Sequence, residues 1–323
     1  MTPEATAIRE LVDRHRRVLV LSHKDPDGDT LGSALAMRLV LEEMGKQVVN
    51  RVPPPVADMY TFLPGYETLN APAGGWEPEL VLVMDASNLE RLAGVMAGVP
   101  EGTPIVNIDH HVSNTRFGDV NLVVPTACST AEVTYDLLRD WGVVPTAGVA
   151  ANLYAGVLTD TGSFRHENTT HRALTIAADL VLLGADAAAI AEAVYKRRKL
   201  STLKLQALVM AGIRFECDDR LVYACATLED LRRAGAAADE TEGLIDMLNS
   251  VDGLEVALLF KEIDGGLTKV SVRTRGQISA NEVAAAFGGG GHARAAGAEL
   301  RLPIAEAVPA FLAEARGYLT PPA

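Results

Sequence analysis

Cysteine is scarce in this sequence, and its pattern excludes two classes of protein. The three cysteines, Cys128, Cys217 and Cys225, are odd in number and lack the paired spacing of zinc ligands. A chain of 323 residues with so few cysteines is not a disulfide scaffold. The composition therefore predicts a reducing environment, which we expect to be the cytoplasm.

Long apolar runs are also missing. No apolar stretch approaches the length that spans a bilayer. Charged residues interrupt the segment 1–17, which makes it a poor signal peptide. We therefore expect a cytoplasmic protein that has no membrane partner.

Basic residues are few relative to acidic ones. The sequence has 29 Lys and Arg against 42 Asp and Glu, which gives a net charge of −13. Sequence-independent binding of long duplex nucleic acid depends on dense Lys and Arg, so this charge argues against it. A short anionic substrate in a local pocket remains compatible with the composition.

Apolar material, by contrast, is plentiful. Hydrophobic residues make up 48% of the chain and charged residues 22%, which is enough to bury the cores of about two domains. Short apolar runs predict buried strands at 18–22, 48–52, 80–84 and 105–108. Helical spacing predicts helices at 31–44, 129–141 and 147–158. This alternation predicts an α/β fold with an open, mostly parallel sheet flanked by helices.

A second domain is predicted from a change of pattern near residue 212. The preceding region, from about residue 171, is helical and rich in alanine. The segments RFECDDRLVYACATL and EVALLFKEIDGGLTKVSVRTR then each predict a β-hairpin, with turns at Asp218 and Asp219 and at Gly265 and Gly266. We therefore predict a first domain at 1–185, a helical connector at 186–211 and a smaller α+β domain at 212–323.

Polar residues follow three of the predicted strands. His23 follows VLVLS, Asp85 follows LVLVM, and the triplet 109–111 (DHH) follows IVNI. Ligands bind at the carboxyl ends of the strands in open α/β sheets, so these residues are expected to meet in one crevice. Asp and His are also common turn residues, but that alternative does not account well for three strands ending in the same way.

The residues expected in this crevice are typical of a metal site. Asp27 and Asp29 follow His23 closely, and Asp160 lies in the segment GVLTDTGSF. Carboxylates this close repel one another unless protons or cations neutralise them. Several carboxylates with two or three imidazoles and no thiolate favour Mn²⁺ or Mg²⁺ over structural zinc. The number of ligands exceeds the need of one ion, so we predict a two-metal site suited to displacement at phosphorus.

The motifs together resemble a known family. The runs SHKDPDGDTLGS, VMDAS, DHH with the following VSNTRFGDVNLV, TDTGSF and FGGGGHARAAG occur in the order of the DHH phosphoesterases. More narrowly, they resemble the branch that carries a DHH-associated C-terminal domain, typified by nanoRNase (oligoribonuclease) and pAp phosphatase enzymes. The resemblance covers residues 22–297. It implies a catalytic first domain and a substrate-binding C-terminal domain.

The resemblance also implies two Mn²⁺ ions that share Asp85. The two predicted ligand sets are His23, Asp27 and Asp85, and Asp29, Asp85, His110 and Asp160. Mg²⁺ and Co²⁺ remain alternatives to Mn²⁺. Asp25 is expected to be a loop residue outside both sets. A water or hydroxide between the ions would be the nucleophile, because two cations lower its pKa.

Two more residues are expected to act beside the metals. Asp109 accepts a hydrogen bond that orients an imidazole. By resemblance, His111 faces the substrate phosphate or the leaving group. Together with Asp85, these residues make up the predicted catalytic group.

A glycine-rich segment is the main candidate for substrate binding in the second domain. Gly288, Gly289, Gly290 and Gly291 cost conformational entropy unless the backbone must turn sharply or approach something closely. Bare N–H groups ahead of a helix form a phosphate cradle, and a flexible linker is the alternative. The resemblance implies that Arg273 and His292 hold a terminal phosphate or base. Ser129, as helix cap or phosphate contact, and Arg116 complete the candidate substrate-binding residues.

The predicted activity is metal-dependent hydrolysis of short single-stranded RNA or DNA oligonucleotides to mononucleotides, together with hydrolysis of pAp to AMP and phosphate. One alternative is a phosphodiesterase for c-di-AMP or for the linear dinucleotides pApA and pGpG. Another, from a different class, is a non-catalytic nucleotide sensor, although every expected ligand is present. Apolar helices in the first domain are compatible with a homodimer.

Overall fold

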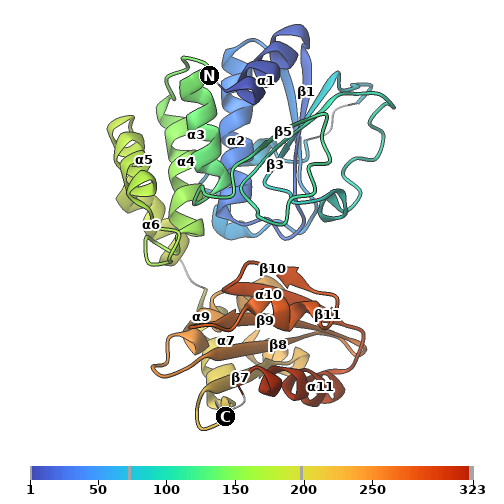
Figure 1. Cartoon of the computed structure of the whole chain (residues 1–323), viewed down its shortest axis with the longest axis vertical. Coiled ribbons are helices and arrows are strands. Elements are labelled where there is room, and N and C mark those ends of the chain that lie inside the picture. The colour runs from blue at the N-terminus through green and yellow to red at the C-terminus, as the bar shows by residue number, and fades with distance from the viewer. Residues whose placement is uncertain (1, 72–73, 197–198, 320–323) are drawn as a thin grey trace. The chain divides into compact units, whose positions relative to one another are not determined.

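The chain forms two compact units, at 1–197 and 198–323. The computed structural model describes residues 2–71, 74–196 and 199–319 (Figure 1). The first unit is an α/β structure and the second has a mixed sheet with helices, which confirms the predicted fold class.

The first unit is built on a five-stranded sheet in which every neighbouring pair is parallel. The strand order is β2-β1-β3-β4-β5. The strands are β1 (Arg17–Ser22), β2 (Gln47–Arg51), β3 (Leu80–Met84), β4 (Ile105–Asp109) and β5 (Val120–Val123). The first four confirm the predicted strands. The fifth was not predicted, because its four residues are only half-buried and include Asn121, so they form no continuous apolar run.

Both faces of this sheet are buried. Val18 and Val20 of β1 enter a large core shared with the helices, whereas Leu19 and Leu21 enter a smaller core on the opposite face. Leu92 and its neighbours cover that second face. Burial on both faces explains why the strand sequences are continuous apolar runs without polar alternation.

The helices of the first unit cover one face of the sheet, where α2, α3 and α4 run side by side (Figure 1). They are α1 (Pro3–Arg14), α2 (Gly28–Glu43), α3 (Thr130–Asp140), α4 (Ala147–Asp160), α5 (His171–Leu182) and α6 (Ala187–Tyr195). Short 3₁₀ helices are η1 (Asp58–Tyr60), η2 (Tyr66–Thr68) and η3 (Leu89–Leu92). The predicted helices at 31–44, 129–141 and 147–158 are confirmed, and the first begins earlier because Asp27 caps it.

Two glycines allow α2 and α4 to pack at very short distance. A Cβ atom on Gly32 would lie 2.4 Å from the carbonyl oxygen of Asn152. A Cβ atom on Gly156 would lie 2.6 Å from Ala131 Cβ and 2.8 Å from Asp29 Oδ1. Real Cβ atoms do not approach other atoms this closely, so glycine is required at both positions. This close packing brings the start of α2 and the end of α4 to the same end of the sheet.

The second unit contains a six-stranded sheet of order β10-β11-β9-β8-β7-β6, in which only β7 and β8 are parallel among the paired described strands. Its strands are β6 (Arg214–Glu216), β7 (Leu221–Ala226), β8 (Val256–Asp264), β9 (Leu267–Thr274), β10 (Gly290–Gly291) and β11 (Ala295–Leu300). The predicted hairpins are confirmed as β6–β7 and β8–β9.

Helices cover both faces of the second sheet. They are α7 (Leu200–Ala211), α8 (Leu228–Ala234), α9 (Leu244–Asn249), α10 (Ala280–Ala285) and α11 (Ile304–Gly317), with the 3₁₀ helix η4 (Ala238–Thr241). Leu258 and Phe260 of β8 enter the core formed with α10 and α11, and Ala257 and Leu259 enter the core formed with α7, α8 and α9.

The segment 186–211, predicted as a connector, contains α6 and α7. The first of these helices belongs to the first compact unit and the second to the other unit. Residues 197 and 198 of this segment lie outside the described residues. The boundaries at 185 and 211 remain a prediction.

Among the described residues, no single helix has both the length and the apolar composition required to cross a bilayer. The pair α5 and α6, which is bent by 113°, meets the criterion only when both helices are counted together.

Candidate metal centre

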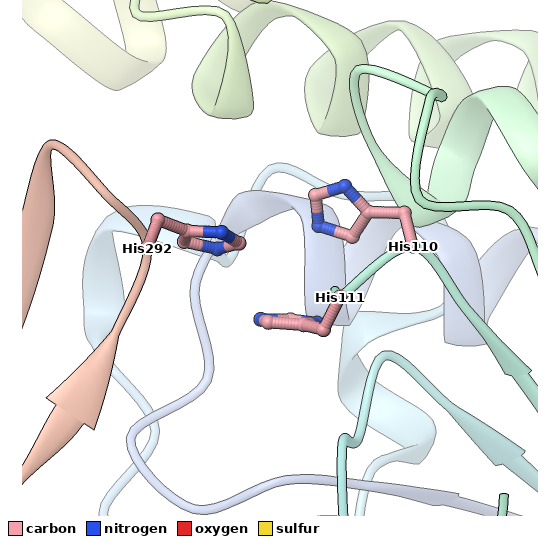
Figure 2. A group of neighbouring side chains, drawn as sticks. All are labelled: His110, His111 and His292. Carbon is pink, nitrogen blue, oxygen red and sulfur yellow. The ribbon is translucent and has the colours of Figure 1, made fainter. Parts of the chain in front are cut away.

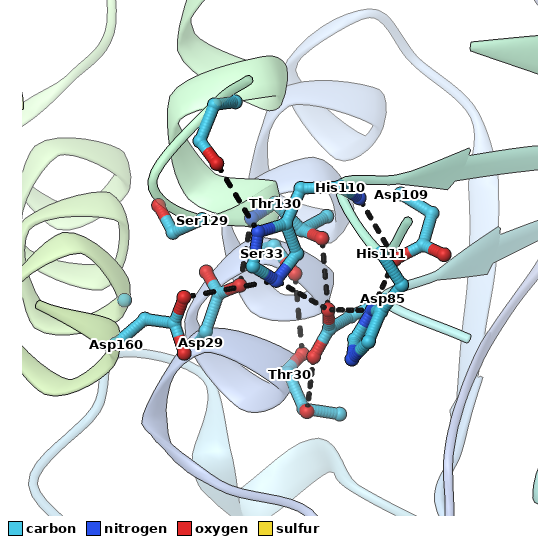
Figure 3. A network of polar contacts seen from close by, with 12 residues as sticks. Asp29, Thr30, Ser33, Asp85, Asp109, His110, His111, Ser129, Thr130 and Asp160 are labelled. Carbon is cyan, nitrogen blue, oxygen red and sulfur yellow. Dashed lines mark hydrogen bonds and ion pairs between the residues drawn. The ribbon is translucent and has the colours of Figure 1, made fainter. Parts of the chain in front are cut away.

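The carboxyl ends of three neighbouring strands bring the predicted residues together. His23 follows β1, Asp85 follows β3, and Asp109 is the last residue of β4. Figure 3 shows the carboxylates and imidazoles of this region converging on Asp85. His23 is 3% exposed and Asp85 is 2% exposed, so these ionisable groups are buried. The prediction that distant segments meet at one edge of the sheet is confirmed.

Asp85 is held by two threonine hydroxyls. Its Oδ2 accepts a hydrogen bond from Thr30 Oγ1 at 2.6 Å, and its Oδ1 accepts one from Thr130 Oγ1 at 2.9 Å. The backbone of Asp85 has a φ of 59°, a left-handed conformation that is uncommon for a residue other than glycine. These contacts fix the carboxylate in the middle of the cluster.

The imidazoles of His23 and His110 both present Nε2 to carboxylates. Nδ1 of His23 lies 2.6 Å from the carbonyl oxygen of Lys24, and Nδ1 of His110 lies 3.3 Å from that of Ala127. A carbonyl only accepts hydrogen bonds, so Nδ1 carries the proton in both rings. In the neutral rings the Nε2 lone pairs therefore lie 3.3 Å and 3.8 Å from oxygens of Asp85.

The cluster has more hydrogen-bond acceptors than protons to donate to them, which favours a bound cation. Thr30 Oγ1 lies 2.7 Å from His23 Nε2, 2.6 Å from Asp85 Oδ2 and 3.0 Å from Asp27 Oδ1. A hydroxyl donates one proton, so it satisfies only one of these three acceptors. A divalent cation among the unsatisfied oxygen and nitrogen atoms would remove the repulsion, and the donor set therefore fits a metal.

The carboxylates of Asp27 and Asp29 accept hydrogen bonds at the N-termini of two different helices. Asp27 Oδ1 caps α2 by accepting hydrogen bonds from the N–H groups of Asp29 and Thr30, both at 3.0 Å. The two oxygens of Asp29 accept from the N–H groups of Thr130 and Ala131 at 2.7 and 2.9 Å, at the start of α3. The alternation in the sequence DGD thus directs the carboxylates of Asp27 and Asp29 to hydrogen-bond donors of different helices.

Burial raises the pKa of Asp29 well above its ordinary value, and the charges of Asp85 and Asp160 raise it further. Burial also raises the pKa of Asp160, assisted by the charges of Asp27 and Asp85. For Asp85, burial acts to raise the pKa, but the hydrogen bond that the His23 ring donates when it is charged, together with the nearby imidazole charges, outweighs it and holds the pKa below its ordinary value. In the metal-free protein, protons thus compete for this site.

Within the described residues of the first unit, three groups of ligand atoms have the compactness of a metal site, and all three include Asp85. Within each group the ligand atoms lie within 4.8 Å of one another: His23, Asp27 and Asp85; Asp29, Asp85 and His110; and Asp85, Asp109 and His111. The first group equals one predicted ligand set, and the second contains three members of the other. Asp160 completes that set at a longer range, with Oδ2 lying 3.6 Å from His110 Nε2. These acidic and histidine groups could therefore hold metal.

His111 is positioned by Asp109, as predicted for an orienting carboxylate. Asp109 Oδ1 lies 2.7 Å from His111 Nδ1, and its Oδ2 accepts a hydrogen bond from Asn114 Nδ2 at 2.5 Å. Burial acts to lower the pKa of His111, but the hydrogen bond to Asp109 and the charge of Asp85 raise it to about 9. The rings of His110 and His111 lie edge to face (Figure 2), and their centroids are 4.8 Å apart. His292, also drawn in Figure 2, belongs to the second unit.

Two candidate substrate contacts of the first unit lie in different environments. Ser129 is buried and caps α3, where its Oγ accepts a hydrogen bond from the N–H of Glu132 at 3.1 Å. The capping role, one of two predicted for Ser129, is therefore present. Arg116 is exposed in the loop after β4, with a φ of 52° and its N–H donating to Asn114 Oδ1 at 2.6 Å.

The prediction that the four glycines form a phosphate cradle ahead of a helix is wrong. Gly288 and Gly289 follow α10 instead of preceding a helix, and Gly290 and Gly291 form the short strand β10 paired with β11. Gly288 lies in the turn after α10, with a φ of 70°. A Cβ atom on Gly289 would lie 2.2 Å from the carbonyl oxygen of Gly297, so close strand packing explains this glycine. Close backbone approach, one of the predicted reasons for these glycines, is present at Gly289 and Gly291, where the neighbour is the chain itself.

Arg273 and His292 also lie in the second unit. Arg273 is on β9, with its Nε 3.3 Å from Asp246 Oδ1 and its side chain 28% exposed. His292 is exposed, and its N–H donates to the carbonyl of Ala295 at 2.7 Å. Their predicted contact with substrate remains a prediction.

Sequence reasoning missed the residues that hold the cluster in place. Thr30, Thr130 and Asn114 are not among the predicted site residues. Thr30 lies three residues after the cap Asp27, so its position in the first turn of α2 could have suggested a side chain directed at the strand ends. Asn114 carries no such local signal, because its role depends on the folding of the loop after β4.

Metal binding is expected to stabilise the first unit. Mn²⁺ at about 100 times its dissociation constant should raise the melting temperature by roughly 5–10 °C, because it binds only the folded site. Differential scanning fluorimetry with and without Mn²⁺, and after chelation, measures this shift. A melting temperature that is indifferent to Mn²⁺, Mg²⁺ and Co²⁺ would contradict the site.

The increase in melting temperature caused by Mn²⁺ should also become larger as pH rises. Asp29 and Asp160 have raised pKa values, so they keep protons at a pH where ordinary carboxyl groups have lost them. In metal-free protein the stability from these protonated groups is present at low pH and is lost as pH rises through the raised pKa values. Metal binding requires the deprotonated carboxylates, and Mn²⁺ affinity is therefore expected to increase over the same range. Calorimetric titration at several pH values measures it.

Comparison with known proteins places this architecture in a family. The model of the DHH family, N-terminal domain, matches residues 17–185, and the model of the DHHA1 domain matches residues 218–320. The chain therefore belongs to the DHH family. Its similarity extends over nearly the whole length of a bifunctional oligoribonuclease and PAP phosphatase NrnA from Thermus thermophilus, which is 34% identical over 94% of this chain and 90% of that protein.

Two other comparisons agree with this assignment. The crystal structure of an exopolyphosphatase-related protein from Bacteroides fragilis superposes with a TM-score of 0.90, at 25% identity, covering 99% of this chain and 98% of that one. A cyclic-di-AMP phosphodiesterase PdeA from Listeria monocytogenes is 24% identical over 93% of this chain, but the match covers only 47% of that protein.

Proposed function

We propose that this chain is a two-metal phosphoesterase that hydrolyses short oligoribonucleotides to mononucleotides and also removes phosphate from pAp. The observation that carries the proposal is the pair of compact ligand groups, His23–Asp27–Asp85 and Asp29–Asp85–His110, which share one buried carboxylate. The NrnA relative, whose name states both activities, supplies the choice of substrates.

The two proposed metal positions differ in their ligands. His23, Asp27 and Asp85 would hold one ion, and Asp29, Asp85, His110 and Asp160 would hold the other. Oxygen and imidazole ligands without thiolate suit Mn²⁺, with Mg²⁺ and Co²⁺ as alternatives. Paired divalent ions supply an activated water at neutral pH and offset the charge on a phosphate undergoing displacement.

Protein groups complete this chemistry. Thr30 and Thr130 hold the carboxylate of Asp85 so that its two oxygens face different ligand groups. Asp109 holds His111 through Nδ1, which leaves Nε2 to donate a hydrogen bond to a phosphate or leaving-group oxygen when the ring is charged. The protein thus provides positioning and a proton donor at the site of hydrolysis.

The second unit is proposed to provide further substrate contacts. Arg273 and His292 are candidate donors to a terminal phosphate or base. Replacing Arg273 by Gln would then raise KM for oligonucleotides and leave Mn²⁺ affinity unchanged, because this residue would contact the substrate and not the metal.

A cyclic dinucleotide phosphodiesterase is the second candidate function. It is favoured by the PdeA relative, but this chain accounts for less than half of that protein. A non-catalytic nucleotide sensor is the weaker alternative, because its site would have no need of the full set of carboxylates and imidazoles that converge here.

Product analysis tests the proposal. Purified protein with Mn²⁺ is incubated with end-labelled RNAs of two to ten nucleotides, and in parallel with pAp, pApA and c-di-AMP. We expect mononucleotides from the shortest RNAs and AMP from pAp, with little conversion of c-di-AMP. Preferential cleavage of c-di-AMP would favour the second function, and absence of turnover with every substrate despite bound Mn²⁺ would favour a sensor.

A further inference from the structure

Arg91 is fixed beside the candidate metal centre by its main chain. It lies on η3, six residues after Asp85. Its N–H donates to Asn88 Oδ1 at 3.1 Å, and its carbonyl accepts from the N–H of Lys24 at 2.7 Å. The carbonyl of Lys24 in turn accepts from His23 Nδ1 at 2.6 Å. These hydrogen bonds do not involve the side chain of Arg91, so the main-chain position of Arg91 does not depend on its side chain.

Among the residues that the structure describes, the guanidinium of Arg91 has no hydrogen-bond or ion-pair partner. Its Nε atom is buried and has no hydrogen-bond partner. Across 2–71, 74–196 and 199–319, the structure shows no ion pair and no side-chain hydrogen bond for Arg91. A partly buried cation without a partner is unfavourable, and five donors in a planar group suit an anion with paired oxygens.

The side chain also lies within electrostatic range of His111. Burial and, more weakly, the charge of Arg91 act to lower the pKa of His111, and the combined effects of Asp109 and Asp85 outweigh them. A carboxylate-rich centre thus has a nearby arginine that pairs with none of its described carboxylates. This is the arrangement expected if the partner of the arginine is supplied from outside the chain.

We propose that Arg91 binds a phosphate group of the substrate next to His111. The inference rests on the proposed function, since the phosphate would be that of an oligonucleotide or of pAp. A guanidinium binds phosphate oxygens through two parallel hydrogen bonds, and this adds orientation as well as charge. If Arg91 only balanced the nearby carboxylates, its replacement would alter Mn²⁺ affinity and leave phosphate affinity unchanged.

The test compares wild type with Arg91→Gln and Arg91→Lys in the full chain loaded with Mn²⁺. We measure the dissociation constant of inorganic phosphate by calorimetry, and kcat/KM for a 5′-phosphorylated diribonucleotide. Arg91→Gln is expected to weaken phosphate binding and lower kcat/KM, each by about 10- to 100-fold, because it removes charge-assisted hydrogen bonds. Arg91→Lys should show a smaller loss, and both variants should keep the Mn²⁺ affinity and melting temperature of wild type.

Arg38→Gln is the matched control. Arg38 also has a buried Nε without a hydrogen-bond partner, but its guanidinium pairs with Glu42 at 2.7 Å on α2. This variant should bind phosphate and turn over substrate as wild type does. Unchanged phosphate affinity in Arg91→Gln, or a loss explained by weaker Mn²⁺ binding, would overturn the inference.

The outcomes separate the inference from the proposed function. If wild type binds phosphate in an Arg91-dependent manner but hydrolyses no oligonucleotide or pAp, the function is wrong and the phosphate site stands. If wild type hydrolyses RNA and Arg91→Gln does so equally well, the function stands and the role of Arg91 is wrong. Failure of wild type to bind phosphate or to turn over any substrate contradicts both.

Discussion

Asp85→Asn is expected to lower kcat for oligoribonucleotide hydrolysis by roughly 10³-fold or more and to remove Mn²⁺ binding at both proposed positions. Asp85 belongs to each of the three compact ligand groups formed within the first unit's described residues, and no other carboxylate belongs to more than one of them. Asn nearly preserves the shape of Asp and tolerates the left-handed backbone at a φ of 59°. The effect should therefore arise from the lost charge and ligand atom, with the fold retained.

Asp25→Asn is the matched control for this variant. Asp25 is an exposed carboxylate of the same acidic segment, and its φ of 54° is likewise left-handed. The substitution makes the same chemical change at a position outside the ligand groups, so activity and Mn²⁺ affinity should stay near wild type. Calorimetry and steady-state kinetics measure both variants. Comparable Mn²⁺ binding in Asp85→Asn and wild type would show that the shared carboxylate is not a ligand.

Gly32→Ala is expected to have the largest effect on stability. The added Cβ would lie 2.4 Å from the carbonyl oxygen of Asn152 and 3.2 Å from the backbone nitrogen of Gly156. Both neighbours are main-chain atoms of α4, which cannot move aside as a flexible side chain could. Overpacking of this kind costs about 1–3 kcal/mol of unfolding free energy. Chemical denaturation measures this loss.

The same substitution should also reduce activity. Separation of α2 from α4 would move Asp29, near the start of α2, away from Asp160 at the end of α4. Mn²⁺ affinity should fall together with stability. Gly148→Ala is the control on α4, because its Cβ would make only an ordinary contact of 3.5 Å with Leu39 Cδ1. A Gly32→Ala protein as stable as Gly148→Ala would contradict the close packing of these helices.

The sequence predicted where the side chains of the candidate metal centre meet because they occur in local patterns with a shared destination. His23, Asp85 and Asp109 each follow an apolar run, and parallel strands bring their carboxyl ends to one edge. The spacing of Asp27 and Asp29 likewise follows from a helix that begins at Gly28. In each case, the local sequence pattern determines at which strand end or helix start the side chain lies.

Residues whose role depends on tertiary contacts could not be predicted in this way. Thr130 donates to Asp85 across 45 positions of sequence, and Asn114 reaches Asp109 only through the fold of a loop. The four glycines at 288–291 show the opposite error. Their local pattern resembles a phosphate loop, but at Gly289 and Gly291 the requirement for glycine comes from a strand that follows later in the chain.

The most direct test of the two-metal account is a crystal structure of the protein grown with Mn²⁺, with anomalous diffraction data collected at the manganese edge. The account predicts two anomalous peaks about 3.5–4 Å apart, with Asp85 bound to both. One of these ions would also be bound by His23 and Asp27, and the other by Asp29, His110 and Asp160. A single peak, or ions bound away from Asp85, would contradict it.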